Sequence, residues 1–203
     1  MKNYFVVFEG PDGVGKSTLI KALAENLADQ HLSVEIVNKG VDFIDNAIVE
    51  LKKPSNSLYN INAHFLLAAS NSILTYNEKN NSASNKIYLI DRYIYTTIAY
   101  NCALGFDYRT AQLIAKLVPA PDLVFLCCLD TSAMIERKKE IESIEVGFKE
   151  INRENYIEYQ NKVKQYYNKL FTSNDKFVKV NTDNLNTAVT YTKKYILELI
   201  KEK

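Results

Sequence analysis

The sequence predicts an α/β fold in which a five-stranded parallel sheet carries helices on both faces. Three observations support this prediction. Short apolar runs alternate with longer segments whose apolar residues recur at helical spacing. The apolar runs are continuous, as expected of parallel strands buried on both faces. The chain has 203 residues, a length that suits one domain, so we expect residues 1–203 to form a single domain.

The first part of the chain begins with an apolar run of strand length. The segment after it has Leu19, Ile20, Leu23 and Leu27 on one side of a helix. Pro54 ends a later helix because proline cannot continue one. In chain order, the elements expected here are strand Tyr4–Phe8, helix Lys16–Gln30, strand Val34–Val37, helix Asp42–Lys53 and helix Leu58–Glu78.

The second part continues the alternation of strands and helices. Pro119 follows the end of one helix, and Thr131 can cap the start of another. The expected elements are strand Ile87–Ile90, helices Tyr93–Ala103 and Tyr108–Leu117, strand Leu123–Leu129, a helix from Thr131 to about Lys139, helix Arg153–Leu170, strand Phe177–Val180 and helix Leu185–Lys201. Ligands of such sheets bind at the carboxyl ends of the strands, so we expect the chemistry just after Phe8, Val37, Ile90 and Leu129.

Composition excludes several classes of protein. The formal net charge is +1, which gives no overall electrostatic footprint for nucleic acid or an anionic membrane. We therefore expect neither partner. Three cysteines without a spacing pattern favour a reducing compartment, and the first apolar run is too short for a signal peptide, so we expect a cytoplasmic protein. His31 and His64 are far apart and have no cluster of ligand residues nearby, which argues against a histidine metal site.

A phosphate-binding motif follows the first expected strand. It matches G-x-x-x-x-G-K-[ST] in full, with an apolar strand before it and an amphipathic helix after it. Its main-chain N–H groups and the helix N-terminus are expected to hold phosphate oxygens. Lys16 would supply a cation to the β- and γ-phosphates, and Ser17 a ligand for Mg²⁺. The ATP-binding residues expected here are Gly10, Pro11, Asp12, Gly13, Val14, Gly15, Lys16, Ser17 and Thr18. We therefore predict a P-loop kinase fold.

An acidic–basic pair follows the expected strand Ile87–Ile90. Asp91 can join the magnesium shell, and Arg92 can bind a phosphate with two parallel hydrogen bonds. Transfer of a phosphoryl group between two nucleotides needs both, because charge must be neutralised on the donor and on the acceptor. The sequence therefore predicts an ATP-dependent phosphotransferase, with a nucleoside monophosphate as acceptor.

These motifs together resemble the thymidylate kinase family. The resemblance rests on Phe8–Thr18, on Asp91-Arg92-Tyr93 followed by Thr96-Thr97 and Ala99-Tyr100, and on Pro121–Val124 leading to Leu129-Asp130, in the same order over most of the chain. It implies transfer of the γ-phosphate of ATP to dTMP with Mg²⁺, giving dTDP, by a cytosolic homodimer.

The resemblance also implies roles for single residues. Asp12 is expected near the sugar 3′-hydroxyl or the acceptor phosphate, Asp91 at Mg²⁺ and Arg92 at the acceptor phosphate. Thr96 stands where the family usually has serine, Thr97 lies near the base, and Tyr100 disfavours a 2′-hydroxyl. Three further acceptor-site positions carry residues that differ from the family pattern, namely Lys39 as a replacement cation, Leu67 in place of an aromatic residue and Asn71 in place of an arginine.

These differences leave alternatives open. A related kinase could act on another deoxynucleoside monophosphate or on a deoxynucleoside. A nucleotide-dependent switch ATPase is a third possibility, with Asp91 as its strand-end carboxylate, although the adjacent Arg92 fits an acceptor site better.

Residues 141–153 are expected to form a lid over ATP. The segment Ile141–Asn152 has no clear periodicity and is flanked by cations. A lid would exclude water that otherwise hydrolyses ATP. Because Gly13 follows Asp12 in the P-loop, the resemblance implies that the lid supplies a catalytic cation. Arg137 and Arg153 are the candidates, whereas we expect Lys138 and Lys139 on the surface.

Overall fold

The computed structural model describes residues 2–52, 60–82, 85–138, 140–171 and 176–201. Its centre is one sheet whose strands run in the order β2-β3-β1-β4-β5, with every neighbouring pair parallel. The strands are β1 (Tyr4–Glu9), β2 (Val34–Val37), β3 (Ile87–Asp91), β4 (Leu123–Cys128) and β5 (Phe177–Asn181). The predicted five-stranded parallel sheet is confirmed.

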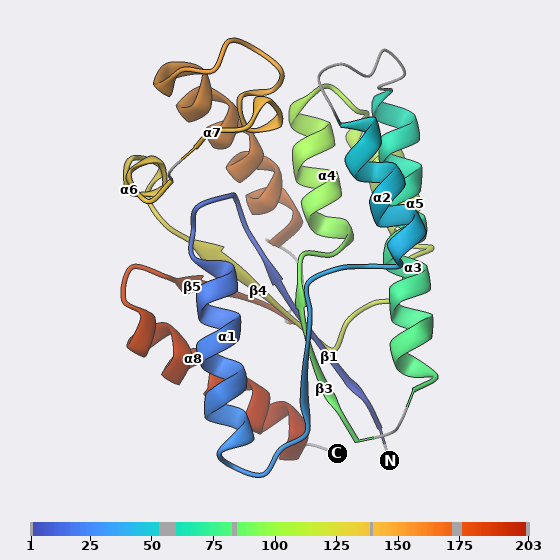
Figure 1. Ribbon diagram of the computed structural model, residues 1–203, viewed down its shortest axis with the longest axis vertical. Coiled ribbons are helices and arrows are strands. Elements are labelled where there is room, and N and C mark those ends of the chain that lie inside the picture. The colour runs from blue at the N-terminus through green and yellow to red at the C-terminus, as the bar shows by residue number, and fades with distance from the viewer. Residues whose placement is uncertain (1, 53–59, 83–84, 139, 172–175, 202–203) are drawn as a thin grey trace.

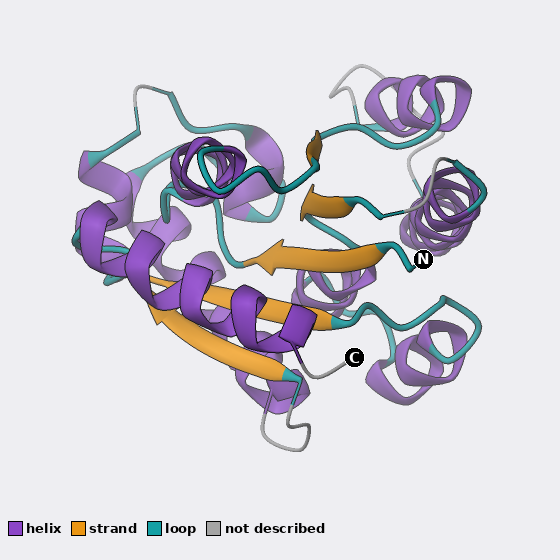
Figure 2. Ribbon diagram, turned by 90° about the horizontal axis from the view of Figure 1, so that it is seen from below, coloured by secondary structure: helices purple, strands orange, loops and turns teal. Residues whose placement is uncertain are grey.

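Helices cover both faces of this sheet (Figures 1 and 2). Alternate residues of β1 divide the core: Phe5 and Val7 belong to one apolar cluster, and Val6 and Phe8 belong to the other. The first cluster includes residues of α3, α4 and α7, and the second includes residues of α1 and α8. The helices are α1 (Lys16–Ala28), α2 (Asp42–Leu51), α3 (Ile61–Asn80), α4 (Ile94–Ala103), α5 (Tyr108–Ala115), α6 (Thr131–Glu136), α7 (Arg153–Phe171) and α8 (Leu185–Lys201).

The strand register brings three strand ends to the same edge of the sheet. Phe8 of β1 lies opposite Asp91 of β3, and Glu9 lies opposite Leu126 of β4. The loops that follow β1, β3 and β4 therefore meet, as expected for the ligand-binding edge of a doubly wound sheet.

The helix after β4 is shorter than predicted. It ends at Glu136 and does not continue toward Lys139, which lies outside the described residues. Asp130, rather than Thr131, occupies its N-cap position. The next segment, expected to be irregular, contains one 3₁₀ turn, η1 (Ser143–Val146).

The boundaries of most other helices also differ from the prediction, by one or two residues except at the start of α3. α3 begins at Ile61 because the Asn60 side chain accepts hydrogen bonds from two main-chain N–H groups of its first turn, at 2.9 and 3.2 Å. The predicted start at Leu58, and Pro54, lie outside the described residues. α5 ends at Ala115, before the predicted end at Leu117.

Within the described ranges, no helix is both long enough and apolar enough to cross a bilayer.

Candidate active site

The P-loop connects β1 to α1 and curls over the edge of the sheet. Gly10 and Gly13 have φ angles of 136° and 83°, which side-chain-bearing residues rarely adopt. A Cβ atom on Gly10 would lie 2.5 Å from the carbonyl oxygen of Cys127, and one on Gly13 would lie 2.9 Å from that of Met134. Glycine is therefore required at both positions for the loop to pack this closely against β4 and α6.

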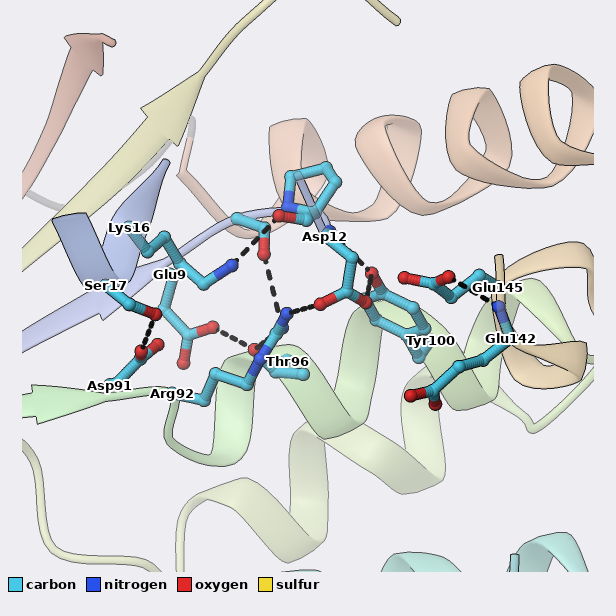
Figure 3. A network of polar contacts seen from close by, with 12 residues as sticks. Glu9, Asp12, Lys16, Ser17, Asp91, Arg92, Thr96, Tyr100, Glu142 and Glu145 are labelled. Carbon is cyan, nitrogen blue, oxygen red and sulfur yellow. Dashed lines mark hydrogen bonds and ion pairs between the residues drawn. The ribbon is translucent and has the colours of Figure 1, made fainter. Parts of the chain in front are cut away.

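The lysine and serine at the start of α1 lie as the motif predicts. Lys16 is 6% exposed, and its Nζ donates to the Pro11 carbonyl at 2.9 Å. Burial lowers the pKa of Lys16 to about 8. Ser17 Oγ donates to Asp91 Oδ2 at 2.7 Å, which links the P-loop to the end of β3 (Figure 3).

Ser17 and Asp91 fit a magnesium ion that is shared with phosphates. Asp91 Oδ1 is buried and has no hydrogen-bond partner among the described residues. A hydroxyl and a carboxylate, completed by phosphate oxygens and water, are the usual protein contribution to Mg²⁺ sites in kinases. No cluster of three or more His, Cys, Asp or Glu residues that could hold a metal occurs in the described part of the chain.

Arg92 crosses from the end of β3 to the P-loop. Its Nη2 forms an ion pair with Asp12 Oδ1, and its Nη1 donates to the Gly10 carbonyl and to Thr96 Oγ1, both at 3.2 Å (Figure 3). Burial alone would raise the pKa of Asp12, but the charges of Arg92 and Lys16 outweigh it and hold that pKa well below its usual value. Asp12 is therefore ionised across the physiological range.

Tyr100 of α4 completes this group. Its hydroxyl donates to Asp12 Oδ2 at 2.8 Å and accepts from the Asp12 N–H at 3.1 Å (Figure 3). These two hydrogen bonds fix the tyrosine ring beside the P-loop, where it lines a cavity that also contacts α2 and α3.

Two cavities meet at this corner. One, of about 540 Å³, is lined by the P-loop, by Arg137 and by the segment after β5. The other, of about 350 Å³, is lined by α2, α3, α4 and the lid segment. Asp12, Asp91 and Arg92 line both. A group bound in one cavity can therefore reach a group bound in the other.

Most of the predicted acceptor residues line the second cavity. Lys39, Thr96 and Thr97 do so, together with Arg92 and Tyr100. The Thr96 hydroxyl, however, is already held by neighbouring side chains, since it donates to Glu9 and accepts from Arg92.

Two predicted acceptor residues are placed differently from the expectation. Leu67 is absent from the lining, and its neighbour Ala68 is present. Asn71 lines the cavity, but its amide is bound elsewhere: Nδ2 donates to Asp45 Oδ1 at 2.6 Å, and Oδ1 accepts from the Val41 N–H at 2.8 Å. Asn71 therefore fastens the loop after β2 to α3.

The predicted lid cations lie in different surroundings. Arg137 lines the first cavity and donates to the Thr182 carbonyl at 3.3 Å. Arg153 is exposed and lies apart from both cavities. Lys138 was expected on the surface, but its side chain is only 16% exposed because it forms an ion pair with buried Glu145.

Several residues of the site were not found from the sequence, among them Lys52, His64 and Glu9. Lys52 and His64 line the second cavity. His64 Nδ1 lies 3.0 Å from Asn101 Oδ1, and burial lowers the pKa of His64 to about 4, so the ring is neutral. Glu9 is fully buried at the end of β1. Only Glu9 left a signal in the sequence, as the acidic residue that ends an apolar strand beside the P-loop.

Comparisons with known proteins agree with this arrangement. A sequence model of the family described as thymidylate kinase matches residues 8–191. The chain is 31% identical over 182 residues to the "Probable thymidylate kinase" of Pyrococcus abyssi, covering 84% of this chain and 83% of the relative. It is 31% identical over 187 residues to the protein of the same name from Methanococcus vannielii, covering 89% and 87%. It is 27% identical over 177 residues to the "Thymidylate kinase" of Dictyostelium discoideum, covering 82% and 72%.

Proposed function

The chain belongs to the thymidylate kinase family, and from this premise we propose how its two cavities divide the reaction. The reaction transfers the γ-phosphate of ATP to dTMP and gives dTDP. ATP occupies the cavity lined by the P-loop and Arg137, and dTMP occupies the cavity between α2, α3 and α4. The observation that carries this proposal is that Asp12, Asp91 and Arg92 line both cavities.

On the donor side, the P-loop residues 10–18 hold the phosphates of ATP. Main-chain N–H groups and the N-terminus of α1 contact the phosphate oxygens, as in other P-loop proteins. Lys16 Nζ donates a hydrogen bond to the Pro11 carbonyl. We expect it to move to the transferring phosphate, where its charge is stabilising. Arg137 lines the same cavity close to Gly15 of the P-loop, and we propose it as the further cation on the donor side.

Ser17 and Asp91 are the protein ligands that we assign to Mg²⁺. When bound, the ion neutralises charge on the phosphate oxygens of ATP and orients them for transfer. The buried Asp91 Oδ1, which has no hydrogen-bond partner among the described residues, supports this assignment.

On the acceptor side, Arg92 binds the phosphate of dTMP. Its ion pair with Asp12 orients the guanidinium toward the boundary between the cavities. Asp12 and Tyr100 contact the deoxyribose, and the fixed tyrosine ring disfavours a 2′-hydroxyl. Lys39 adds a second cation, and Thr97 lies near the base. No protein base is required, because the acceptor phosphate is itself the nucleophile and catalysis consists of positioning and charge neutralisation.

We further propose that residues 1–203 act as one domain with residues 141–153 as its lid. Glu142 and Ile144 of this segment line the acceptor cavity, and Gln160 Nε2 donates to the Glu145 carbonyl at 2.9 Å. Closure of the segment would exclude water from the transferring phosphate.

The family resemblance also supports a homodimer in the cytoplasm. Phe43 and Val49 of α2 and Leu66 of α3 are 68%, 61% and 54% exposed, and we propose that a second copy covers these apolar side chains. Light scattering of the wild type and of Leu66→Arg tests the dimer: a wild-type protein of monomer mass would reject it. Fractionation of cells tests the location.

The test of the activity is ADP release coupled to a dehydrogenase, measured with each common nucleoside monophosphate and with thymidine. We expect the highest kcat/KM with dTMP and none without an acceptor. A higher value with another monophosphate would reject thymine as the base, and activity with thymidine alone would indicate a nucleoside kinase. Hydrolysis of ATP at a comparable rate without any acceptor would reject the kinase assignment.

A further inference from the structure

Glu9 is a fully buried carboxylate at the edge of the active site, and no step proposed above uses it. It is the last residue of β1 and is 0% exposed. Its oxygens accept hydrogen bonds from the Tyr93 N–H at 2.8 Å, from the Thr96 hydroxyl and from the Tyr167 hydroxyl at 3.2 Å. A buried carboxylate is costly unless it is hydrogen-bonded in this way, and each of these contacts lies next to Arg92.

The first contact fixes the backbone at Arg92. This residue has a φ of 76°, in the left-handed region that a side chain disfavours. The peptide group that follows it donates the Tyr93 N–H to Glu9 Oε1, and the Arg92 N–H donates to the Phe8 carbonyl at 3.0 Å. Both sides of the strained turn are therefore fastened to the end of β1.

The second contact fixes the guanidinium of Arg92. The Thr96 hydroxyl donates its single proton to Glu9 Oε2, and its oxygen then accepts from Arg92 Nη1 at 3.2 Å (Figure 3). A neutral amide or carboxylic acid at position 9 carries a proton on one of its two terminal atoms, which would face either the Tyr93 N–H or the Thr96 hydroxyl and break that contact. The ionised carboxylate thus selects the hydroxyl orientation that holds Arg92.

We propose that ionised Glu9 is a positioning residue for the acceptor phosphate. It acts through Arg92, whose backbone it holds through Tyr93 and whose guanidinium it holds through Thr96. The inference rests on the proposed function, because it takes Arg92 as the ligand of the acceptor phosphate.

The protonation state of Glu9 changes near neutral pH, which gives this role a measurable signature. Burial raises the pKa of Glu9 to about 7, against the opposing effect of Thr96 and Arg92. Among the described residues, four other titratable groups face the Glu9 carboxylate. They are Arg92 between β3 and α4, Tyr95 on α4, Tyr167 on α7 and Cys127 on β4. Burial raises the pKa of both tyrosines and of the thiol far above neutral, and Arg92 stays charged.

The test is the variant Glu9→Gln, which keeps the shape of the side chain and removes its charge. At about pH 8.5 we expect kcat/KM for dTMP to fall about 10- to 100-fold, the range for loss of hydrogen bonds to a charged group, while KM for ATP is unchanged. Calorimetry should show weaker binding of dTMP and unchanged binding of thymidine, which has no phosphate for Arg92.

The pH profile separates positioning from general damage to the fold. The ratio of wild-type to variant kcat/KM should rise with pH, from a small fraction of its full value at about pH 6 to its full value at about pH 8.5, and reach half of that value near the Glu9 pKa of about 7. The titrations of dTMP and of Lys16, whose pKa is about 8, occur in both proteins and cancel in the ratio.

Two further variants keep the inference testable. Thr96→Val removes the hydroxyl that links Glu9 Oε2 to the guanidinium, together with its contact to the Tyr167 hydroxyl, and leaves the Tyr93 contact in place. It should also weaken binding of dTMP without affecting thymidine, and it tests the inference if Glu9→Gln does not fold. The matched control is Glu35→Gln, which removes a carboxylate of β2 that pairs with Lys86 at the surface, and it should behave as wild type.

Three results would overturn the inference while leaving the kinase assignment intact. The first is that Glu9→Gln phosphorylates dTMP with the kinetics of the wild type. The second is that Glu9→Gln binds dTMP and thymidine more weakly by the same factor. The third is that Thr96→Val binds dTMP with the affinity of the wild type. Failure of the wild type to phosphorylate dTMP would instead reject the proposed function.

Discussion

We expect Glu9→Gln to remove a pH-dependent loss of stability. Burial raises the pKa of Glu9 from 4.5 to about 7, so the folded chain binds this proton more tightly than the unfolded chain does. Linkage then requires the free energy of unfolding to fall as pH rises from about 4.5 to about 7, and to stay level above that, where the carboxyl is ionised in both states. The variant has no proton to lose at position 9, so this contribution disappears.

The size of the effect follows from the two pKa values. The interval from 4.5 to about 7 corresponds to about 3 kcal/mol. Urea unfolding followed by circular dichroism, between about pH 5 and about pH 8 in both proteins, measures it. Other titrating groups are common to both proteins, so the difference between them isolates Glu9. A difference that does not change with pH, or a wild type that gains stability relative to the variant as pH rises, would refute the reasoning.

The remaining predictions concern three other charged or titratable groups. Lys16→Met should lower kcat for dTMP about 100- to 1000-fold in steady-state assays, because it removes charge from the transferring phosphate; a loss below about tenfold would contradict this. Arg137→Ala should raise KM for ATP and leave KM for dTMP unchanged, whereas Arg153→Ala should change neither, since Arg137 lines the nucleotide cavity and Arg153 does not. A selective effect of Arg137→Ala on dTMP would exclude this placement. The wild type should lose stability as pH falls from about 6.5 to about 4, because burial lowers the pKa of His64 from 6.5 to about 4 and the unfolded chain takes up the proton first. His64→Gln should remove this loss, and thermal unfolding with the same pH slope in both proteins would contradict the prediction.

The sheet and the P-loop could be predicted because their signals are local. The strands are continuous apolar runs, and the motif from Gly10 to Ser17 carries its own strand and helix context. The ends of helices could be predicted less well where a side-chain hydrogen bond sets the first or last residue. Asn60 caps α3 through its own amide, and α6 ends at Glu136 although charged residues continue the helical pattern.

The acceptor site was harder to predict because its side chains are placed by distant partners. The amide of Asn71 is bound by Asp45, from another helix, and the burial of Lys138 depends on Glu145, in a segment without periodicity. A shift of one residue on α3 turns the side chain by about 100°, which is why Ala68 and not Leu67 lines the cavity.

Glu9 shows what the sequence contained but did not explain. Its position after an apolar strand was visible, and the resemblance included it. Its partners Thr96 and Tyr167 lie 87 and 158 residues away along the chain. Only the folded chain brings them to the same carboxylate.

The central claim is that ATP and dTMP occupy neighbouring cavities that meet at Asp12, Asp91 and Arg92. The most direct measurement is inhibition by a bisubstrate compound in which adenosine and thymidine are joined through their 5′ oxygens by five phosphates. We predict that one molecule binds per chain and competes with both ATP and dTMP. Competition with ATP alone, or binding of two molecules per chain, would contradict it.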